Sequence, residues 1–168
     1  MPLAARIQLI PMLTCTGPVG QQIFNIACHQ ATCYWLHQEA TGNSLTGDDF
    51  VNRNALFNIG NTMTALAAFG TRVQDATALR NLANGTVLVF TDLQGGAKHS
   101  CVLDSRGLIG GYNQIGWLFG GYNHQFTTHP KTQVQWKPQS RVTLSSGQPG
   151  HLIAIGEQTA LQFAQNNF

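Results

Sequence analysis

The chain has 168 residues, of which 43% are hydrophobic and only 10% are charged. This length suits one domain with a substantial core, and the apolar content excludes a disordered polymer. The net charge is only +2 and there is no basic run, which argues against a protein that tracks nucleic-acid phosphates or an anionic membrane. Polarity comes instead from 16 Gln, 12 Asn and 16 Thr.

Residues 1–20 predict an irregular or extended N-terminal arm. Pro2, Pro11 and Pro18 interrupt its modest apolar run, and it carries one Arg. A secretory signal peptide needs a basic start and a continuous apolar stretch, so none is expected. No stretch of the chain approaches 18 consecutive apolar residues, so no membrane span is expected either.

Residues 21–84 are predicted to form the helical part of a single domain, 1–168. Asn25 is a suitable N-cap and Gly42 a suitable C′ residue, and the apolar spacing between them predicts a helix from about residue 26 to residue 41. Thr46, followed by two aspartates, resembles the start of a second helix. Further helices are expected over residues 62–69 and 74–82.

Residues 85–168 are predicted to form the mainly β part of the same domain. The run TVLVF at 86–90 is almost continuously apolar, which is typical of a central strand. A helix is expected to close the chain at 157–166. Helices followed by an antiparallel sheet predict an α+β fold. The other expected strands cover residues 99–103, 108–113, 132–138, 141–144 and 151–155.

The four cysteines are expected to be free thiols. A chain of this length does not need disulfides, and without a secretory signal nothing indicates an oxidising compartment. No metal or other cofactor is predicted, because there is no C-x-x-C pair and the Cys and His residues between 28 and 37 lack a zinc-ligand spacing. The cysteines are Cys15, Cys28, Cys33 and Cys101.

Cys28 is the candidate nucleophile. It lies in the first turn of the helix predicted from residue 26, where backbone N–H groups and the helix dipole are expected to lower the pKa of the thiol. Gln22, six residues earlier, is a candidate donor to an oxyanion. A small buried hydrophobic residue is the alternative interpretation of Cys28.

His99 is the candidate acid–base residue, because it opens a strand directly after a Gly-Gly turn and can face a cleft. With the next turn centred between Ser105 and Arg106, His99 falls opposite Tyr112 and beside Asn113. The Asn113 amide can then fix the tautomer of the imidazole. A cysteine, a distant histidine and an amide on a neighbouring strand are typical of thiol hydrolases.

The scarcity of acids supports Asn113 as the partner of the histidine. Beyond His99, the acidic residues are Asp104, in the hairpin turn, and Glu157, near the end of the chain. Gln114 is adjacent to Asn113, but alternation along a strand directs the two side chains to opposite faces, so only one can serve.

These residues resemble the papain-like cysteine hydrolases. The interval of six between Gln22 and Cys28 matches the oxyanion glutamine and the nucleophile of that family. The segments C-x-x-A-x-x-x-W, from Cys28, and H-S-x-V-x(9)-Y-N-x-x-G, from His99, resemble its compact bacterial effector and toxin branch. The resemblance covers residues 22–117 and implies a papain-like fold, with the nucleophile at the start of a central helix packed on an antiparallel sheet.

The resemblance also implies a function: a cysteine-dependent amidohydrolase, either a glutamine deamidase or a cysteine protease, acting through an acyl-enzyme that water hydrolyses. The implied substrate is a host or target protein. As a bacterial effector or toxin with a role in virulence, the protein would stay in the bacterial cytoplasm before export and act in a target-cell cytosol, secreted without a typical signal peptide. An immunity protein or a secretion chaperone is a further implied partner.

Cys33 is the alternative nucleophile. In the papain group an aromatic residue directly follows the nucleophile; His29 follows Cys28, whereas an aromatic pair follows Cys33. However, Cys33 would lie in mid-helix, and six positions before it stands Ala27, which has no oxyanion donor. The electrostatics of the helix start therefore favour Cys28.

Two other functions are open from the sequence. The excess of Asn, Gln, Thr and aromatic residues also suits a non-catalytic protein- or carbohydrate-binding module. A cell-wall amidase toxin would use the same thiol chemistry. The aromatic and Gly-rich segment around Tyr112, Trp117, Phe119 and Tyr122 is expected to form a loop close to the cleft that shapes substrate access.

Overall fold

Helices dominate the first half of the chain and antiparallel strands the second, which confirms the α+β prediction. The computed structural model describes residues 2–18, 20–113 and 124–168, and within them no helix is long and apolar enough to cross a bilayer. The α-helices are α1 (Cys28–Thr41), α2 (Gly47–Asn52), α3 (Asn54–Phe57), α4 (Ile59–Ala67), α5 (Ala76–Arg80) and α6 (Glu157–Asn167). The strands are β1 (Leu13–Gly17), β2 (Gly20–Phe24), β3 (Thr71–Arg72), β4 (Val87–Thr91), β5 (Ala97–Leu103), β6 (Ile109–Asn113), β7 (Gln125–His129), β8 (Trp136–Lys137), β9 (Arg141–Thr143) and β10 (Pro149–Ile155).

Strand β4 lies at the centre of the main sheet. Among the described residues this sheet has eight strands, in the order β7-β6-β5-β4-β10-β9-β8 with β3 beside β10. Leu88 of β4 pairs with Cys101 on one side and with Ala154 on the other. Both faces of β4 are buried, which explains the nearly continuous apolar run in its sequence.

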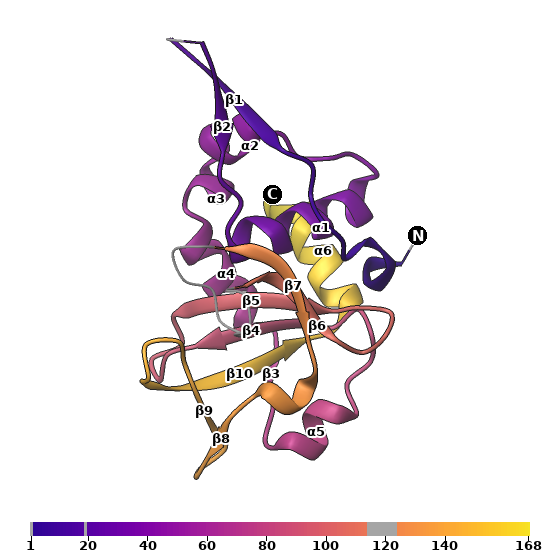
Figure 1. Cartoon of the computed structure of the whole chain (residues 1–168), viewed down its shortest axis with the longest axis vertical. Coiled ribbons are helices and arrows are strands. Elements are labelled where there is room, and N and C mark those ends of the chain that lie inside the picture. The colour runs from indigo at the N-terminus through magenta and orange to yellow at the C-terminus, as the bar shows by residue number, and fades with distance from the viewer. Residues whose placement is uncertain (1, 19, 114–123) are drawn as a thin grey trace.

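Two hydrophobic cores lie on the two faces of the sheet, and successive residues of β4 enter them in turn. Val87 and Val89 belong to the core that includes Trp35 of α1, whereas Leu88 and Phe90 belong to the other. Helices α1, α4 and α6 pack on the first face, and α5 lies on the second (Figure 1). The first turn of α1 is thereby set against β5.

Helix α1 begins two residues later than predicted. Its N-cap is Ala27, which makes no side-chain capping bond, and not Asn25. Its end is as predicted, because Gly42 adopts the left-handed conformation with φ 78° and its N–H donates to the Gln38 carbonyl at 2.9 Å. The start of this helix therefore has backbone N–H groups without a capping side chain.

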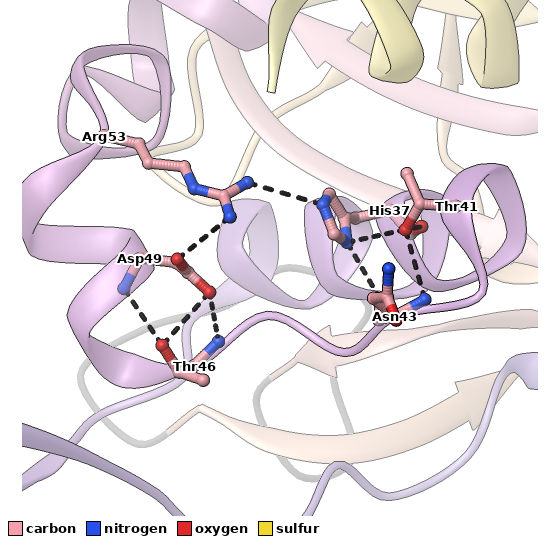
Figure 2. Close-up of polar contacts among 6 residues, drawn as sticks. All are labelled: His37, Thr41, Asn43, Thr46, Asp49 and Arg53. Carbon is pink, nitrogen blue, oxygen red and sulfur yellow. Dashed lines mark hydrogen bonds and ion pairs between the residues drawn. The ribbon is translucent and has the colours of Figure 1, made fainter.

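Helix α2 starts where predicted, and two reciprocal hydrogen bonds cap its N-terminus. The Asp49 N–H donates to Thr46 Oγ1 at 3.2 Å, and the Thr46 N–H donates to the Asp49 carboxylate at 2.8 Å. Arg53 pairs with Asp49 at 3.1 Å and donates to His37 Nε2 at 3.4 Å, as Figure 2 shows. This cluster fastens α2 to the last turns of α1.

The N-terminal arm is more regular than predicted. Strands β1 and β2 form a hairpin that projects from the body of the molecule (Figure 1), while Leu3 and Ile10 are buried in the first core. Pro11 and Pro18 flank β1 and do not interrupt it, so this part of the arm is a regular extended strand.

Two features of the second half also differ from the prediction. Residues 132–138 do not form one strand, since Lys131–Gln133 is a 3-10 turn and only Trp136–Lys137 pair as β8. Their alternation reflects Val134 and Trp136 packing on the second core. Strand β7, which the sequence did not indicate, pairs with β6 along its full length.

Candidate active site

Cys28 is the first residue of α1 and lies against strand β5. Its side chain is buried, with 8% of the residue exposed. Three backbone N–H groups near its sulfur favour the thiolate, those of Ser100, His29 and Cys28 itself. The last two belong to the helix start that no side chain caps, so they are available to the sulfur.

The thiol of Cys28 is not acidified as its position in the helix predicts. Burial raises the pKa of this thiol above its ordinary value, and the three N–H groups lower it by less. The predicted lowering of the pKa is therefore wrong, because the lost solvation of a thiolate outweighs the electrostatics of the helix start. A base must remove the thiol proton when the sulfur reacts at neutral pH.

His99 and Asn113 form a buried hydrogen-bonded pair, with His99 Nε2 at 2.6 Å from Asn113 Oδ1. The Asn113 Nδ2 group donates to Thr127 Oγ1 at 3.1 Å and to the Gly111 carbonyl at 3.3 Å. Because Nδ2 is engaged there, Oδ1 faces the imidazole and accepts a proton carried by Nε2. In the neutral ring, Nδ1 is then the nitrogen that accepts a proton.

The register of the β5–β6 hairpin is shifted by one residue from the predicted turn. Continued along both strands, the observed register sets His99 opposite Asn113 and not opposite Tyr112. Tyr112 instead faces the core beneath α1, where its hydroxyl accepts the N–H of Ile10 at 3.1 Å. The shift explains how the predicted contact between imidazole and amide forms directly across the two strands.

The thiol and the imidazole meet β5 at consecutive residues. The N–H of Ser100 is the group that lowers the pKa of the Cys28 thiol most, and His99 is the residue before it. The Ser100 hydroxyl contacts Thr32 of α1, and the His99 ring lies beside that of its cross-strand partner Phe90, with ring centroids 5.8 Å apart. The structure therefore holds the two halves of the predicted site, the thiol on a peptide N–H and the imidazole on an amide, at adjacent positions of one strand.

Cys33 has the features of a packing group. It lies in the middle of α1 and is fully buried, with Sγ at 3.7 Å from Met63 Sδ. Burial raises the pKa of Cys33 well above its ordinary value, and it does the same to Cys101 of β5, in the second core. Cys28, by contrast, is the first residue of α1, where the free backbone N–H groups lie.

Gln22 lies in the projecting hairpin, exposed and paired with Cys15. Its role as an oxyanion donor stays a prediction. The donors that the structure places at the sulfur are backbone N–H groups, which can serve the same purpose. The other predicted cleft residues lie outside the described residues, namely Gln114, Trp117, Phe119 and Tyr122.

A cavity of about 560 Å³ opens beside the start of α1. Its lining includes Ala27, which precedes Cys28, together with Phe24, Tyr112 and His124. The described residues that line it include no Lys, Arg, Asp or Glu, so the space offers aromatic surface, amides and backbone groups to a ligand. Its volume falls in the range of small-molecule and side-chain pockets.

Sequence reasoning missed two polar residues at the first turn of α1: His29, which lies in that turn, and Ser100 of β5, which contacts it. His29 Nδ1 lies 2.8 Å from Ser100 Oγ. Burial lowers the pKa of His29 to about 4, and the positive charge of nearby His124 adds to the effect. Their places in the chain are the available signal, because each directly follows a predicted site residue, Cys28 or His99.

Comparisons with protein-family models, curated proteins and solved structures give no match to this chain. Within the described ranges, no group of three or more His, Cys, Asp and Glu side chains could hold a metal ion. The functional assignment therefore rests on the geometry around Cys28 and the His99–Asn113 pair.

Proposed function

We propose that this protein is a cysteine-dependent amidohydrolase, with Cys28 as the nucleophile, His99 as the acid–base residue and Asn113 as the group that orients the imidazole. The observation that carries the proposal is the buried 2.6 Å contact between His99 and Asn113, made next to the peptide N–H that the Cys28 sulfur faces. Buried polar pairs of fixed orientation are costly unless satisfied, and this one is satisfied on the Asn113 side by Thr127.

The proposed reaction begins with a neutral thiol, since burial raises the pKa of Cys28. His99 Nδ1 takes the proton as the sulfur attacks the amide carbonyl carbon, and the developing oxyanion is received by backbone N–H groups at the start of α1. The imidazolium then returns the proton to the leaving nitrogen, which departs as ammonia or an amine. Water, activated by the same imidazole, hydrolyses the thioester and regenerates the thiol.

The cavity beside α1 supports an uncharged acyl group as the substrate element. Its described lining combines the aromatic rings of Phe24 and Tyr112 with the amides of Asn25 and Gln125, and carries no formal charge. A protein glutamine or an uncharged peptide segment fits that chemistry. A papain-like fold and an effector or toxin role against a host or target protein belong to the same proposal, supported by the motif resemblance over residues 22–117.

The test measures the alkylation rate of each cysteine, so it does not require the substrate to be known. Alkylation of the native protein by iodoacetamide, followed residue by residue by mass spectrometry, is expected to modify Cys28 faster than Cys33 or Cys101. His99→Ala is expected to slow Cys28 at least about tenfold, because general-base assistance is typically worth a factor of 10² or more. Cys15, which is half-buried in the hairpin, serves as the internal control and keeps its rate.

A folded His99→Ala variant with an unchanged Cys28 rate would remove the basis of the proposal. Equal and slow labelling of the three buried cysteines would favour the non-catalytic binding module instead. Release of ammonia from a glutamine-containing protein, or of a new peptide N-terminus, then separates deamidation from proteolysis, with Cys28→Ala as the blank. Peptidoglycan as the substrate tests the cell-wall amidase.

A further inference from the structure

A continuous run of polar contacts joins the first turn of α1 to strand β5. His29 Nδ1 is 2.8 Å from Ser100 Oγ, Ser100 Oγ is 3.0 Å from Thr32 Oγ1, and Thr32 Oγ1 is 3.2 Å from the carbonyl oxygen of Cys28. Ser100 and Thr32 are fully buried and His29 is half-buried. None of these contacts is required by a helix or a strand, so the side chains themselves create the link.

Taken together, these three contacts have one direction of donation, although Ser100 Oγ also has a second, longer acceptor in the Cys28 carbonyl oxygen, at 3.5 Å. The Cys28 carbonyl can only accept, so the Thr32 hydroxyl donates to it. The Thr32 oxygen must then accept from Ser100, whose single hydrogen is thereby used. Ser100 Oγ in turn accepts from His29, which fixes the proton of His29 on Nδ1.

We propose that His29, Ser100 and Thr32 are positioning residues of the active site, which form a one-way hydrogen-bond relay that holds the start of α1, and with it Cys28, against Ser100 of β5. The inference rests on the proposed function. Ser100 is the pivot: its side chain receives the relay, its N–H meets the sulfur, and the residue before it is the acid–base histidine.

The relay also assigns different tasks to the two histidines near the thiol. His29 is neutral at neutral pH, with a pKa of about 4, and its Nδ1 proton is committed to Ser100. A group of that basicity is a weak proton acceptor for a buried thiol. His29 therefore positions the thiol, and the proton transfer falls to His99.

The experiment compares two variants of α1, each of which loses a hydrogen bond from a threonine hydroxyl to the carbonyl four residues earlier. Thr32→Val removes the hydroxyl that links the relay to the Cys28 carbonyl, and is expected to slow Cys28 alkylation about fivefold, the equivalent of one hydrogen bond. Thr41→Val removes an analogous bond, from the Thr41 hydroxyl to the His37 carbonyl at 2.8 Å, at the far end of the helix. It is expected to lower stability and to leave the Cys28 rate unchanged.

Two further variants guard against a simple folding effect. Thr32→Ser, which keeps the hydroxyl, is expected to restore most of the rate lost in Thr32→Val. His29→Leu, at a half-buried position, removes the first donor and is expected to slow Cys28 by a similar factor, whereas His29→Gln retains a donor and recovers part of it.

The outcomes separate this inference from the proposed function. If Thr32→Val and His29→Leu lower stability but leave Cys28 alkylation unchanged, the relay is purely structural and the inference is overturned, while the dependence on His99 still supports the amidohydrolase. If His99→Ala has no effect on Cys28 but the relay variants do, the relay stands and the proposed chemistry is wrong.

Discussion

The starts of α1 and α2 solve the same physical problem in opposite ways. Each helix begins with backbone N–H groups that have no partner inside the helix. At α2, Thr46 and Asp49 cap those groups reciprocally, whereas at α1 the N-cap is Ala27, which caps nothing. The capped start uses its N–H groups for stability, and the open start turns them toward the sulfur of Cys28.

The surroundings of the two starts follow from this difference. The cap of α2 continues into a polar cluster with Arg53 and the buried His37 (Figure 2), which links the helix to α1. The start of α1 is held instead by the hydrogen bond between Ser100 of β5 and Thr32 of the helix. A cap at α1 would occupy the donors that the thiol uses, so the relay stabilises this helix start without blocking it.

The largest expected effect concerns the capped start. A Cβ at Gly47, the first residue of α2, would lie 2.6 Å from the carbonyl carbon of Thr14 in β1, and backbone cannot yield cheaply. Gly47→Ala is therefore expected to lower the free energy of unfolding by about 1–3 kcal/mol, measured by urea denaturation. The rate of Cys28 alkylation should not change, because β1 takes no part in the relay.

Gly60→Ala is the matched control for that variant. Gly60 lies in α4 with open space around its Cα, and alanine is the better helix former, so this substitution should stabilise the protein by up to about 1 kcal/mol. A Gly47→Ala protein as stable as the wild type would mean that the hairpin does not rest on α2 in solution.

The second prediction removes the cap itself. Thr46→Ala is expected to cost about 1 kcal/mol, because the Asp49 N–H loses its acceptor. Thr46→Ser keeps the hydroxyl and should recover most of that loss. The rate of Cys28 alkylation should be the same in both variants; a slower rate in Thr46→Ala would show that the two helix starts are coupled.

How far the sequence predicts these regions depends on whether the deciding interactions are local. The cap at Thr46 and the end of α1 at Gly42 are local patterns, and both are predicted correctly. The buried strand β4 is equally clear from its apolar run. The pairing of His99 with Asn113 is nearly as local, since one hairpin turn brings them together, although the register is off by one residue.

The rest depends on tertiary contacts that no local pattern records. The N-cap of α1 is Ala27, and because alanine has no preference for N-cap positions, the sequence favours Asn25 instead. The pKa of Cys28 is set by burial under β5, which reverses the expectation from the helix start. The contact of Ser100 with Thr32 joins residues 68 positions apart, and their sequence neighbours give no indication of it.

A smaller effect is expected when a cap is added to the open start. Ala27 has extended backbone angles, φ −116° and ψ −176°, which suit an N-cap residue. Ala27→Ser is expected to raise the free energy of unfolding by about 0.5–1 kcal/mol, and its hydroxyl would compete for the N–H of His29 that now serves the thiol. Cys28 should then alkylate more slowly than the gain in stability alone explains, and the buried Cys33 measures the part that is due to stability.

The smallest expected effect is the pH dependence of a contact at the capped start of α2. Asp48, in the first turn of α2, accepts the N–H of Thr16 at 2.6 Å and the Thr16 hydroxyl at 2.8 Å, and these bonds hold the pKa of its carboxyl below the ordinary value. Because the folded pKa is lowered, the contact is complete above the ordinary carboxyl pKa and is lost as the pH falls through the lowered one. The Thr16 amide resonance, followed by NMR from about pH 6 to about pH 2, should shift with a midpoint below that of a free aspartate. Asp48→Asn should abolish that titration. The open start of α1 has no acidic residue in its first turn, so any titration there over the same range should come from His29, whose pKa is about 4.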